Sequence, residues 1–337
     1  MVRVRPGSSG AGLVFAVMSA ATFGTSGTFA TSLIDAGWSP GAAVTVRIGV
    51  AALVLLVPAL VQLRPMLPTL RAGGRPLLLR TGRLVIIYGL VAVAGCQLFY
   101  FHAVQRLSVG VALLLEYLGV VLVVGWMWLA HGHRPRRLTV AGSVGALVGL
   151  GLVLDLTGHQ HVDLVGVLWG LSAAVGLAVY FVLSAHEEDP LPPIVMACAA
   201  MIVGTVAFGA LGLTGALPMH ATFGQVDFSG HRTSWLVPIL GLAVLAAAFA
   251  YVAGITAARL LGAKVASFVG LTEVLFAVLF AWLLLGQLPG GLQLVGGAFI
   301  VGGVTLVRLD ELGRDGVDSL EDELAGEQAR PAAVGAG

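Results

Sequence analysis

The chain has 337 residues, of which 58% are hydrophobic and only 10% are charged, and its mean hydropathy is +0.98. Soluble domains carry about a quarter charged residues, so this composition excludes a soluble enzyme and a disordered chain. The net charge of +1 supplies no basic field for DNA or RNA, which excludes nucleic acid as a partner. The sequence therefore predicts an integral membrane protein whose first partner is the lipid bilayer.

Apolar runs define the expected elements, because about 20 apolar residues cross the hydrocarbon core of a bilayer. The first run follows a short N-terminal segment, residues 1–11, and is too long for the core of a signal peptide. The predicted fold class is an all-α integral membrane protein with ten transmembrane helices. In chain order these are expected at 12–33, 41–62, 84–104, 107–129, 138–157, 164–185, 194–214, 235–256, 264–285 and 289–308.

The basic residues favour this count and give an orientation. With a cytoplasmic N-terminus, fifteen of the 18 Lys and Arg residues fall in cytoplasmic segments. Only Arg106 and Arg232 fall on the other side, and Arg47 lies inside the second span. Membrane proteins concentrate basic residues on the cytoplasmic side, so we expect both termini in the cytoplasm and the chain in the cell inner (plasma) membrane. The acidic segment 309–337 is predicted to be a disordered cytoplasmic tail.

An internal repeat appears at an offset of 154 residues. The halves 12–157 and 164–308 each hold five expected spans, an odd number, so they would enter the membrane in opposite orientations. Inverted repeats are typical of alternating-access carriers, whose substrate site lies near mid-membrane between the halves. The matched pairs include Gly132 and Gly286, Pro135 and Pro289, Leu138 and Leu292, Gly142 and Gly296, and Gly149 and Gly303.

Three charged residues, Arg47, Glu116 and Glu273, lie well inside expected spans. A charge in the membrane interior is costly, so such residues usually face a cavity or a charged partner. Either glutamate is a candidate for binding a proton or an amine; the alternative is a hydrogen-bonded glutamate that holds helices together. Arg47 is a candidate for binding a substrate carboxylate, and the alternatives are an ion pair with a glutamate or a side chain that extends to the interface.

Aromatic residues with polar tips complete the candidate site. Such side chains suit the wall of a small-molecule site, and the alternative is packing or an interfacial belt. They are Tyr100, His102, Tyr117, Tyr180 and Tyr251.

No metal site, cofactor or enzymatic activity is expected. The two His-x-His pairs, His131 with His133 and His159 with His161, lack further ligands at suitable spacing. Nucleotide-binding and hydrolase motifs are absent from the sequence, and Cys96 and Cys198 are interpreted as buried small hydrophobes.

The segments Leu-Leu-Glu-Tyr-Leu-Gly (114–119) and Leu-Thr-Glu-Val-Leu-Phe-Ala (271–277), each followed by a glycine-rich span, resemble the drug/metabolite transporter superfamily in its ten-helix EamA form. Val-Arg-Ile-Gly (46–49) is similar to an arginine signature of that family. The resemblance covers about residues 12–308. Within the superfamily, residues 115–119 resemble the threonine and homoserine exporter branch, although valine stands at 120 and 274, where the family has proline.

The resemblance implies a secondary transporter that exports small metabolites, with amino acids such as threonine or homoserine as expected substrates and the proton as coupling ion. A monomer and a homodimer are both compatible with the glycine-rich helices. A multidrug or toxic-compound exporter of the same superfamily stays open as the alternative, although no glutamate occurs in the first span. A membrane-embedded enzyme is disfavoured, since no His, Asp or Ser groups converge at one depth. A pore is disfavoured because it would not need inverted halves with isolated mid-membrane glutamates.

Overall fold

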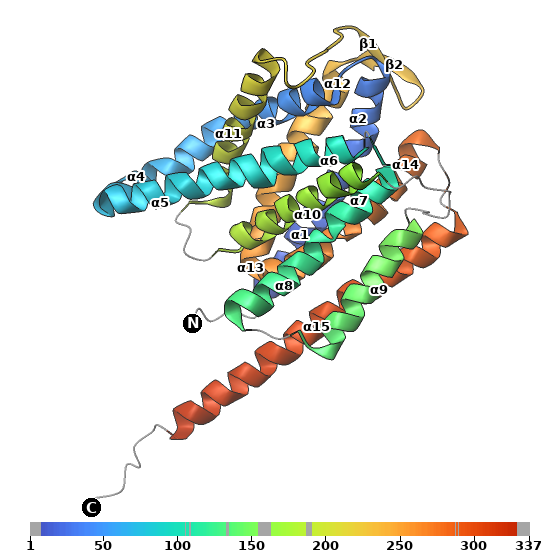
Figure 1. Cartoon of the computed structure of the whole chain (residues 1–337). Coiled ribbons are helices and arrows are strands. Elements are labelled where there is room, and N and C mark those ends of the chain that lie inside the picture. The colour runs from blue at the N-terminus through green and yellow to red at the C-terminus, as the bar shows by residue number, and fades with distance from the viewer. Residues whose placement is uncertain are drawn as a thin grey trace, which may run out of the picture.

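The computed structural model is a bundle of helices with one small β-hairpin (Figure 1). The residues that it describes are 8–104, 106–107, 109–132, 135–153, 163–186, 191–286, 288 and 290–328. The first half contains α1 (Ser8–Gly24), α2 (Ser26–Asp35), α3 (Pro40–Leu63), the short helix η1 (Arg64–Met66), α4 (Leu67–Ala72), α5 (Gly74–Ile87), the π-helix η2 (Tyr88–Gly95), α6 (Cys96–Val104), α7 (Val109–Tyr117), α8 (Gly119–His131) and α9 (Arg137–Val153).

The second half repeats this order with a hairpin inserted. Strands β1 and β2 pair antiparallel, with Val226 opposite Thr233. The elements are α10 (Leu164–Ser184), α11 (Pro193–Leu213), β1 (Gln225–Phe228), β2 (His231–Ser234), α12 (Leu236–Leu240), the π-helix η3 (Gly241–Phe249), α13 (Ala250–Gly270), α14 (Thr272–Leu285) and α15 (Gly291–Gln328).

Eight helical stretches of the described residues are long and apolar enough to cross a bilayer. Two further apolar helices, Arg137–Val153 and Thr272–Leu284, are shorter than that criterion. The longest stretch, Leu236–Gly270, is interrupted at Gly262, where φ is +77° and ψ is 161°. Glycine adopts this backbone conformation without the steric cost that a side chain would bring. The interruption falls between the expected spans 235–256 and 264–285.

Irregular helical segments recur at corresponding positions of the two halves. The offset of 154 residues maps η2 (Tyr88–Gly95) onto 242–249, which lies inside η3. A second irregularity separates α7 from α8 at Leu118 and α13 from α14 at Leu271. Insertions of this kind widen the helix and often accompany functional sites, and here they place the same bends in both halves.

The glycines of the repeat lie where α9 packs on α15 (Figure 1). A Cβ atom on Gly142 would lie 2.7 Å from the carbonyl oxygen of Gly303, and one on Gly149 would lie 2.5 Å from that of Gly296. In sequence, however, Gly142 corresponds to Gly296 and Gly149 to Gly303. The contacts are therefore reciprocal between the halves, and the two backbones touch because no side chain separates them.

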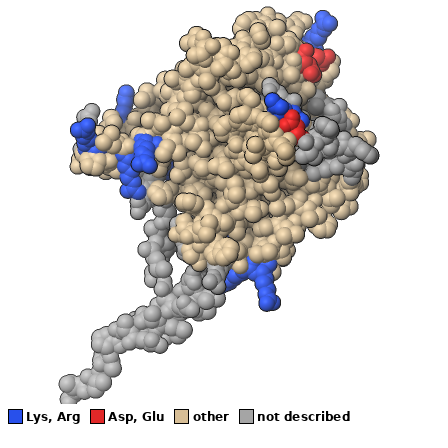
Figure 2. Space-filling view, viewed as in Figure 1, with Lys and Arg blue, Asp and Glu red and all other residues tan. Residues whose placement is uncertain are grey.

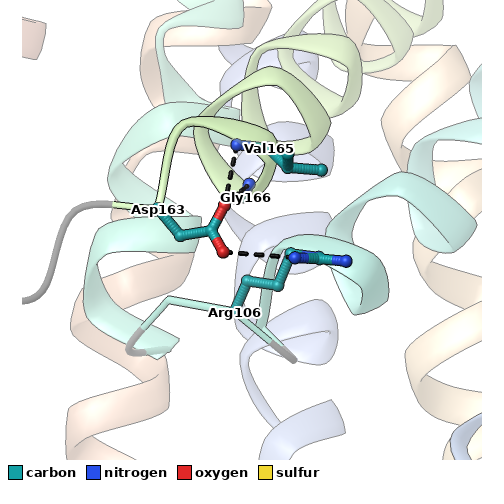
Figure 3. A network of polar contacts seen from close by, with 4 residues as sticks. All are labelled: Arg106, Asp163, Val165 and Gly166. Carbon is teal, nitrogen blue, oxygen red and sulfur yellow. Dashed lines mark hydrogen bonds and ion pairs between the residues drawn. The ribbon is translucent and has the colours of Figure 1, made fainter.

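The start of α10 is fixed by the side chain of Asp163 (Figure 3). Its Oδ1 accepts hydrogen bonds from the backbone N–H groups of Val165 (2.8 Å) and Gly166 (3.1 Å), which caps the helix. Its Oδ2 lies 3.1 Å from Nη1 of Arg106. The Gly166 N–H and the Arg106 guanidinium hold the pKa of Asp163 below its usual value.

The surface in Figure 2 is almost entirely uncharged, with Lys and Arg side chains gathered at the periphery, including the end where α4 and α5 lie. The interior is built from small and apolar side chains of both halves, among them Ile48 on α3, Tyr88 on η2 and Met201 on α11. An apolar belt between charged ends is what a bilayer requires of a spanning protein.

The acidic segment after Leu309 differs from expectation. It was expected to be disordered, and in the structure α15 continues as helix to Gln328. The stretch contains no proline, and its Leu, Glu and Arg residues are good helix formers. Asp310 also anchors it: Thr139 donates a hydrogen bond to Asp310, and Lys264 Nζ lies 3.9 Å from the same carboxyl. Residues 329–337 lie outside the described part.

Candidate functional site

Both intramembrane glutamates lie beside the breaks in their helices. Glu116 is the last residue but one of α7, and Glu273 is the second residue of α14. Each side chain is partly exposed rather than sealed in the core. The two carboxyl groups lie close enough for their charges to interact. Interrupted membrane helices commonly carry ligand sites, because their ends bring polar groups into the bundle.

Arg47 brings a positive charge to the same region. Its Nη2 donates a hydrogen bond to the backbone carbonyl of Ala246 in η3, so α3 and η3 are joined through this side chain. Its guanidinium also interacts electrostatically with Tyr251 and Glu273. Arg47 therefore points into the bundle and does not extend to the interface. Of the alternatives from the sequence, proximity to a glutamate is the one that the geometry fits.

Tyrosines surround the three charges. Tyr117 contacts the Glu273 carboxyl through its side chain and also lies near Glu116. Tyr100 on α6 interacts with both glutamates. Tyr251 on α13 receives a hydrogen bond from Gln97 Nε2 at 3.5 Å. These contacts connect helices from both halves of the chain.

An aromatic cluster extends this group away from the charges. The ring of Tyr251 packs edge-on against Phe23 at 5.1 Å and against Tyr180 at 5.6 Å between centroids. The hydroxyl of Tyr180 lies against Gly254, whose lack of a side chain makes room for it. Tyr180 and Tyr251 are thus part of one continuous aromatic wall between α10 and α13.

His102 is the candidate residue that the structure places elsewhere. Its Nδ1 lies 2.8 Å from the carbonyl oxygen of Leu98, and its ring lies 4.9 Å from that of Trp169 on α10. Phe99 stacks on the same tryptophan. His102 therefore belongs to a packing cluster between α6 and α10, and neither of these contacts reaches the glutamates.

The sequence analysis missed Cys96 and Gln97 as members of the site. Cys96 was interpreted as a small hydrophobe; it is indeed buried, but its Sγ lies 3.3 Å from Oε1 of Glu116. Gln97 is a polar amide inside an apolar span, and it stands three residues before Tyr100. The adjacent polar pair within an apolar run was the available signal, because uncompensated polar groups are rare at that depth.

Among the residues that the structure describes, no group of His, Cys, Asp or Glu is arranged to hold a metal ion. His133, His159 and His161 of the His-x-His pairs lie outside the described residues. The chemistry of the site is therefore that of two carboxyls, one guanidinium, a thiol, an amide and several phenols. Such a set can bind a proton, an amine and a carboxylate.

Comparison with known proteins agrees with the fold. An uncharacterized inner membrane transporter, YicL, of Salmonella typhimurium is 26% identical over 233 residues, which are 67% of this chain and 73% of the relative. An uncharacterized transporter of Archaeoglobus fulgidus is 29% identical over 239 residues, 70% of this chain and 78% of the relative. A pseudopaline exporter, CntI, of Pseudomonas aeruginosa is 35% identical over 69 residues, 20% of this chain and 24% of the relative.

One solved protein structure superposes with a TM-score of 0.70 at 20% identity, covering 89% of this chain and 97% of the other, which shows a shared fold. The EamA-like transporter family matches the chain twice, over residues 10–155 and 164–309. The EamA resemblance is thus confirmed, whereas the threonine and homoserine exporter branch stays a prediction. Two matches that together span most of its length show that the chain is a multi-span membrane transporter and belongs to the EamA-like transporter family.

Proposed function

We propose that this transporter exports small metabolites that carry both an amine and a carboxylate, such as threonine or homoserine, in exchange for protons. The observation that carries the proposal is the meeting of Glu116, Glu273 and Arg47 at one place, on helices from both halves. Two negative charges and one positive charge match the ends of a zwitterion. One of the three relatives is named an exporter, which agrees with the direction.

The two carboxyl groups supply the exchange. Two ionised carboxylates near each other repel, so a proton or a substrate ammonium group that binds between Glu116 and Glu273 relieves the repulsion. Because both ligands compete for the same oxygens, one must leave before the other binds. The planar guanidinium of Arg47 can donate two parallel hydrogen bonds to a carboxylate, and the phenols of Tyr117 and Tyr251 line the rest of the site.

We infer that the halves 12–157 and 164–308 are inverted five-helix repeats, with ten spans in all. Reciprocal contacts of the kind made by Gly142 with Gly303 and Gly149 with Gly296 are what a two-fold relation between the halves produces. The backbone break at Gly262 supplies the additional turn that ten spans need. Alternating access would then consist of one half moving against the other around the central charges.

The proposed orientation has both ends in the cytoplasm, segments 1–11 and 309–337 included, in the inner membrane. It is supported by the excess of basic residues on that side and by the agreement with an inner membrane relative. The proposal is independent of oligomeric state, because a monomer and a homodimer would both contain a complete site per chain.

Counterflow in proteoliposomes tests the proposal directly. Vesicles with the purified protein are loaded with unlabelled threonine, and the entry of labelled threonine is followed at several pH values. We expect entry that depends on the protein, is competed by homoserine and is stimulated by a proton gradient. Protein-dependent exchange of a hydrophobic cation with no exchange of threonine would assign the transporter to the multidrug class instead and contradict the amino-acid proposal.

A substitution at Glu116 tests the role of that carboxyl separately. Glu116→Gln should retain folding and membrane insertion but lose gradient-driven transport, because an amide cannot take up the coupling proton. Asp227→Asn, at an exposed position of strand β1, is the matched control and should transport normally. Unchanged gradient-driven transport by Glu116→Gln would remove that carboxyl from the coupling mechanism.

A further inference from the structure

The two cysteines of the chain lie in similar surroundings, but only one of them contacts a carboxyl. Both are buried, and each Sγ lies 3.5 Å from a backbone carbonyl of a neighbouring helix, Cys96 from Ala173 on α10 and Cys198 from Ala52 on α3. Only Cys96 also meets a carboxyl, with its Sγ 3.3 Å from Oε1 of Glu116. Cys198 is therefore a natural control for what the carboxyl adds.

The thiol of Cys96 has one hydrogen and two acceptors within reach. A thiol donates a single hydrogen bond, so at any moment Cys96 donates either to Glu116 or to the carbonyl of Ala173. An ionised carboxylate is the stronger acceptor, because hydrogen bonds to a charged group are the stronger ones. A protonated carboxyl accepts less well, which leaves the Ala173 carbonyl as the better partner.

The backbone that carries the thiol is held close to α10. A Cβ atom on Gly176 would lie 2.7 Å from Cβ of Cys96, so α6 and α10 are in close contact there. A hydrogen bond of the same kind runs from the Ser19 hydroxyl to the Ala250 carbonyl at 2.8 Å, at the positions that correspond to Ala173 and Cys96 through the repeat, with donor and acceptor exchanged. Gly270 stands at the position that corresponds to Glu116, so the repeat supplies no equivalent carboxyl for this second bond.

Several other groups face the same carboxyl. Glu273 approaches from α14, Tyr117 from α7 itself and Tyr100 from α6. Arg47 on α3 lies next to Glu273, and Tyr251 on α13 interacts with Glu116. These charges and phenols set the ionisation of Glu116 together, and the hydrogen bond from the thiol to Glu116 has in addition a competing acceptor on α10.

We propose that Cys96 is a positioning residue whose thiol donates to Glu116 when that carboxyl is ionised and to the Ala173 carbonyl when it is protonated. Protonation of Glu116 then changes a contact between α6 and α10, which belong to opposite halves of the transporter. The inference rests on the proposed proton binding by Glu116. It deepens the proposed function by linking that proton to the interface between the halves.

Infrared spectroscopy of the S–H stretch reads the thiol without any transport assay. The full-length protein in lipid, with Cys198→Ala so that one thiol is left, is titrated across pH. We expect the S–H band to move between two positions, and to keep one position when Glu116→Gln is added. An S–H band whose position does not change with pH, or still changes with pH in the Glu116→Gln protein, overturns the proposal.

Transport as a function of pH provides the second readout. Cys96→Ala removes a donor to the ionised carboxyl, so the midpoint of the transport pH profile should rise by about one pH unit or less. Cys96→Ser keeps a donor and should stay near the parent, and Cys198→Ala should match the parent. An unchanged midpoint in a folded Cys96→Ala protein contradicts the positioning role. If no variant transports threonine, the infrared result still decides the contact, so the two proposals fail separately.

Discussion

At the scale of single residues, Arg47 interacts with a backbone carbonyl and with a carboxyl group. Its guanidinium donates to the Ala246 carbonyl and interacts with Glu273, so it is held at the centre of the site. The residue lies on α3, a helix of the first half. If it binds the substrate carboxylate, geometry as well as charge is needed, since a lysine offers a point charge where arginine offers two parallel donors.

Arg47→Lys should therefore raise the threonine concentration needed for half-maximal counterflow about tenfold or more, which is the loss of one charge-assisted hydrogen bond. The measurement is the concentration dependence of exchange in proteoliposomes. The amino alcohol of threonine, which lacks the carboxylate, is the matched control and should be affected much less. Equal losses for both compounds would mean that Arg47 maintains the helix contact and does not recognise the carboxylate.

Gly254 shows how tightly the aromatic wall is packed. A Cβ atom there would overlap the Tyr180 hydroxyl and approach the Ser19 hydroxyl at 2.9 Å. Gly254→Ala should destabilise the protein by about 1–3 kcal/mol, the usual cost of overpacking, measured as thermal unfolding in detergent. Gly209→Ala, on α11 with open space around it, should be neutral or slightly stabilising. Adding Tyr180→Phe to Gly254→Ala should restore part of the loss, and no restoration would argue against this overlap as the cause.

At the scale of elements, α9 and α15 are joined backbone to backbone. Gly149→Ala would place a methyl group 2.5 Å from the Gly296 carbonyl oxygen, and backbone cannot rotate away as a side chain can. We expect a clear loss of thermal stability from Gly149→Ala and none from Gly145→Ala, one turn earlier on the same helix with nothing within 4 Å. Equal stability of the two variants would show that α9 and α15 do not pack through these glycines.

Asp163 supports α10 in two ways that pH can separate (Figure 3). Its native pKa is lowered, so its ionised form stabilises the folded state. This contribution is fully present above the unfolded pKa of about 3.9 and is lost as the pH falls through the lower native pKa.

Asp163→Asn should keep the helix cap but lose the Arg106 ion pair, and Asp163→Ala should lose both. Unfolding temperatures at pH 7 should therefore fall in the order parent, Asn, Ala. The difference in unfolding temperature between the parent protein and Asp163→Asn should become smaller at the acid end of the titration. A difference that persists unchanged below the native pKa would exclude the ion pair as its source.

At the scale of the whole molecule, composition and flanking charges were sufficient to predict a helical membrane transporter and most of the helix positions. The family followed from short segments around two glutamates, but the sequence did not establish that Glu116 and Glu273 share one cavity. Other features were not predictable, since they depend on which helices meet. The hydrogen bond of Cys96 arises because α6 packs against both α7 and α10, and His102 lies outside the site because its ring packs on Trp169. Helical periodicity carries little information when helices are apolar on all sides.

The path of the chain between the hairpin and α15 decides between ten spans and fewer. The Ser229 hydroxyl donates to the carbonyl of Leu284, so the hairpin and the end of α14 lie at the same end of the bundle. Between them the chain must cross the molecule and return. The non-helical backbone at Gly262 is where the proposed ten-span path would reverse.

Cysteine labelling in intact cells tests this path and the orientation together. His231→Cys on β2 and Leu288→Cys after α14 are both exposed, as is Arg136→Cys before α9. With ten spans and cytoplasmic ends, an impermeant maleimide should label positions 231 and 288 from outside and position 136 only after permeabilisation. The two native cysteines are buried and give a low background. If 231 and 288 label from opposite sides, α12 to α14 cross the membrane an odd number of times, and the inverted-repeat arrangement is wrong. If both label only after permeabilisation while 136 labels outside, the ten spans stand and the orientation is reversed.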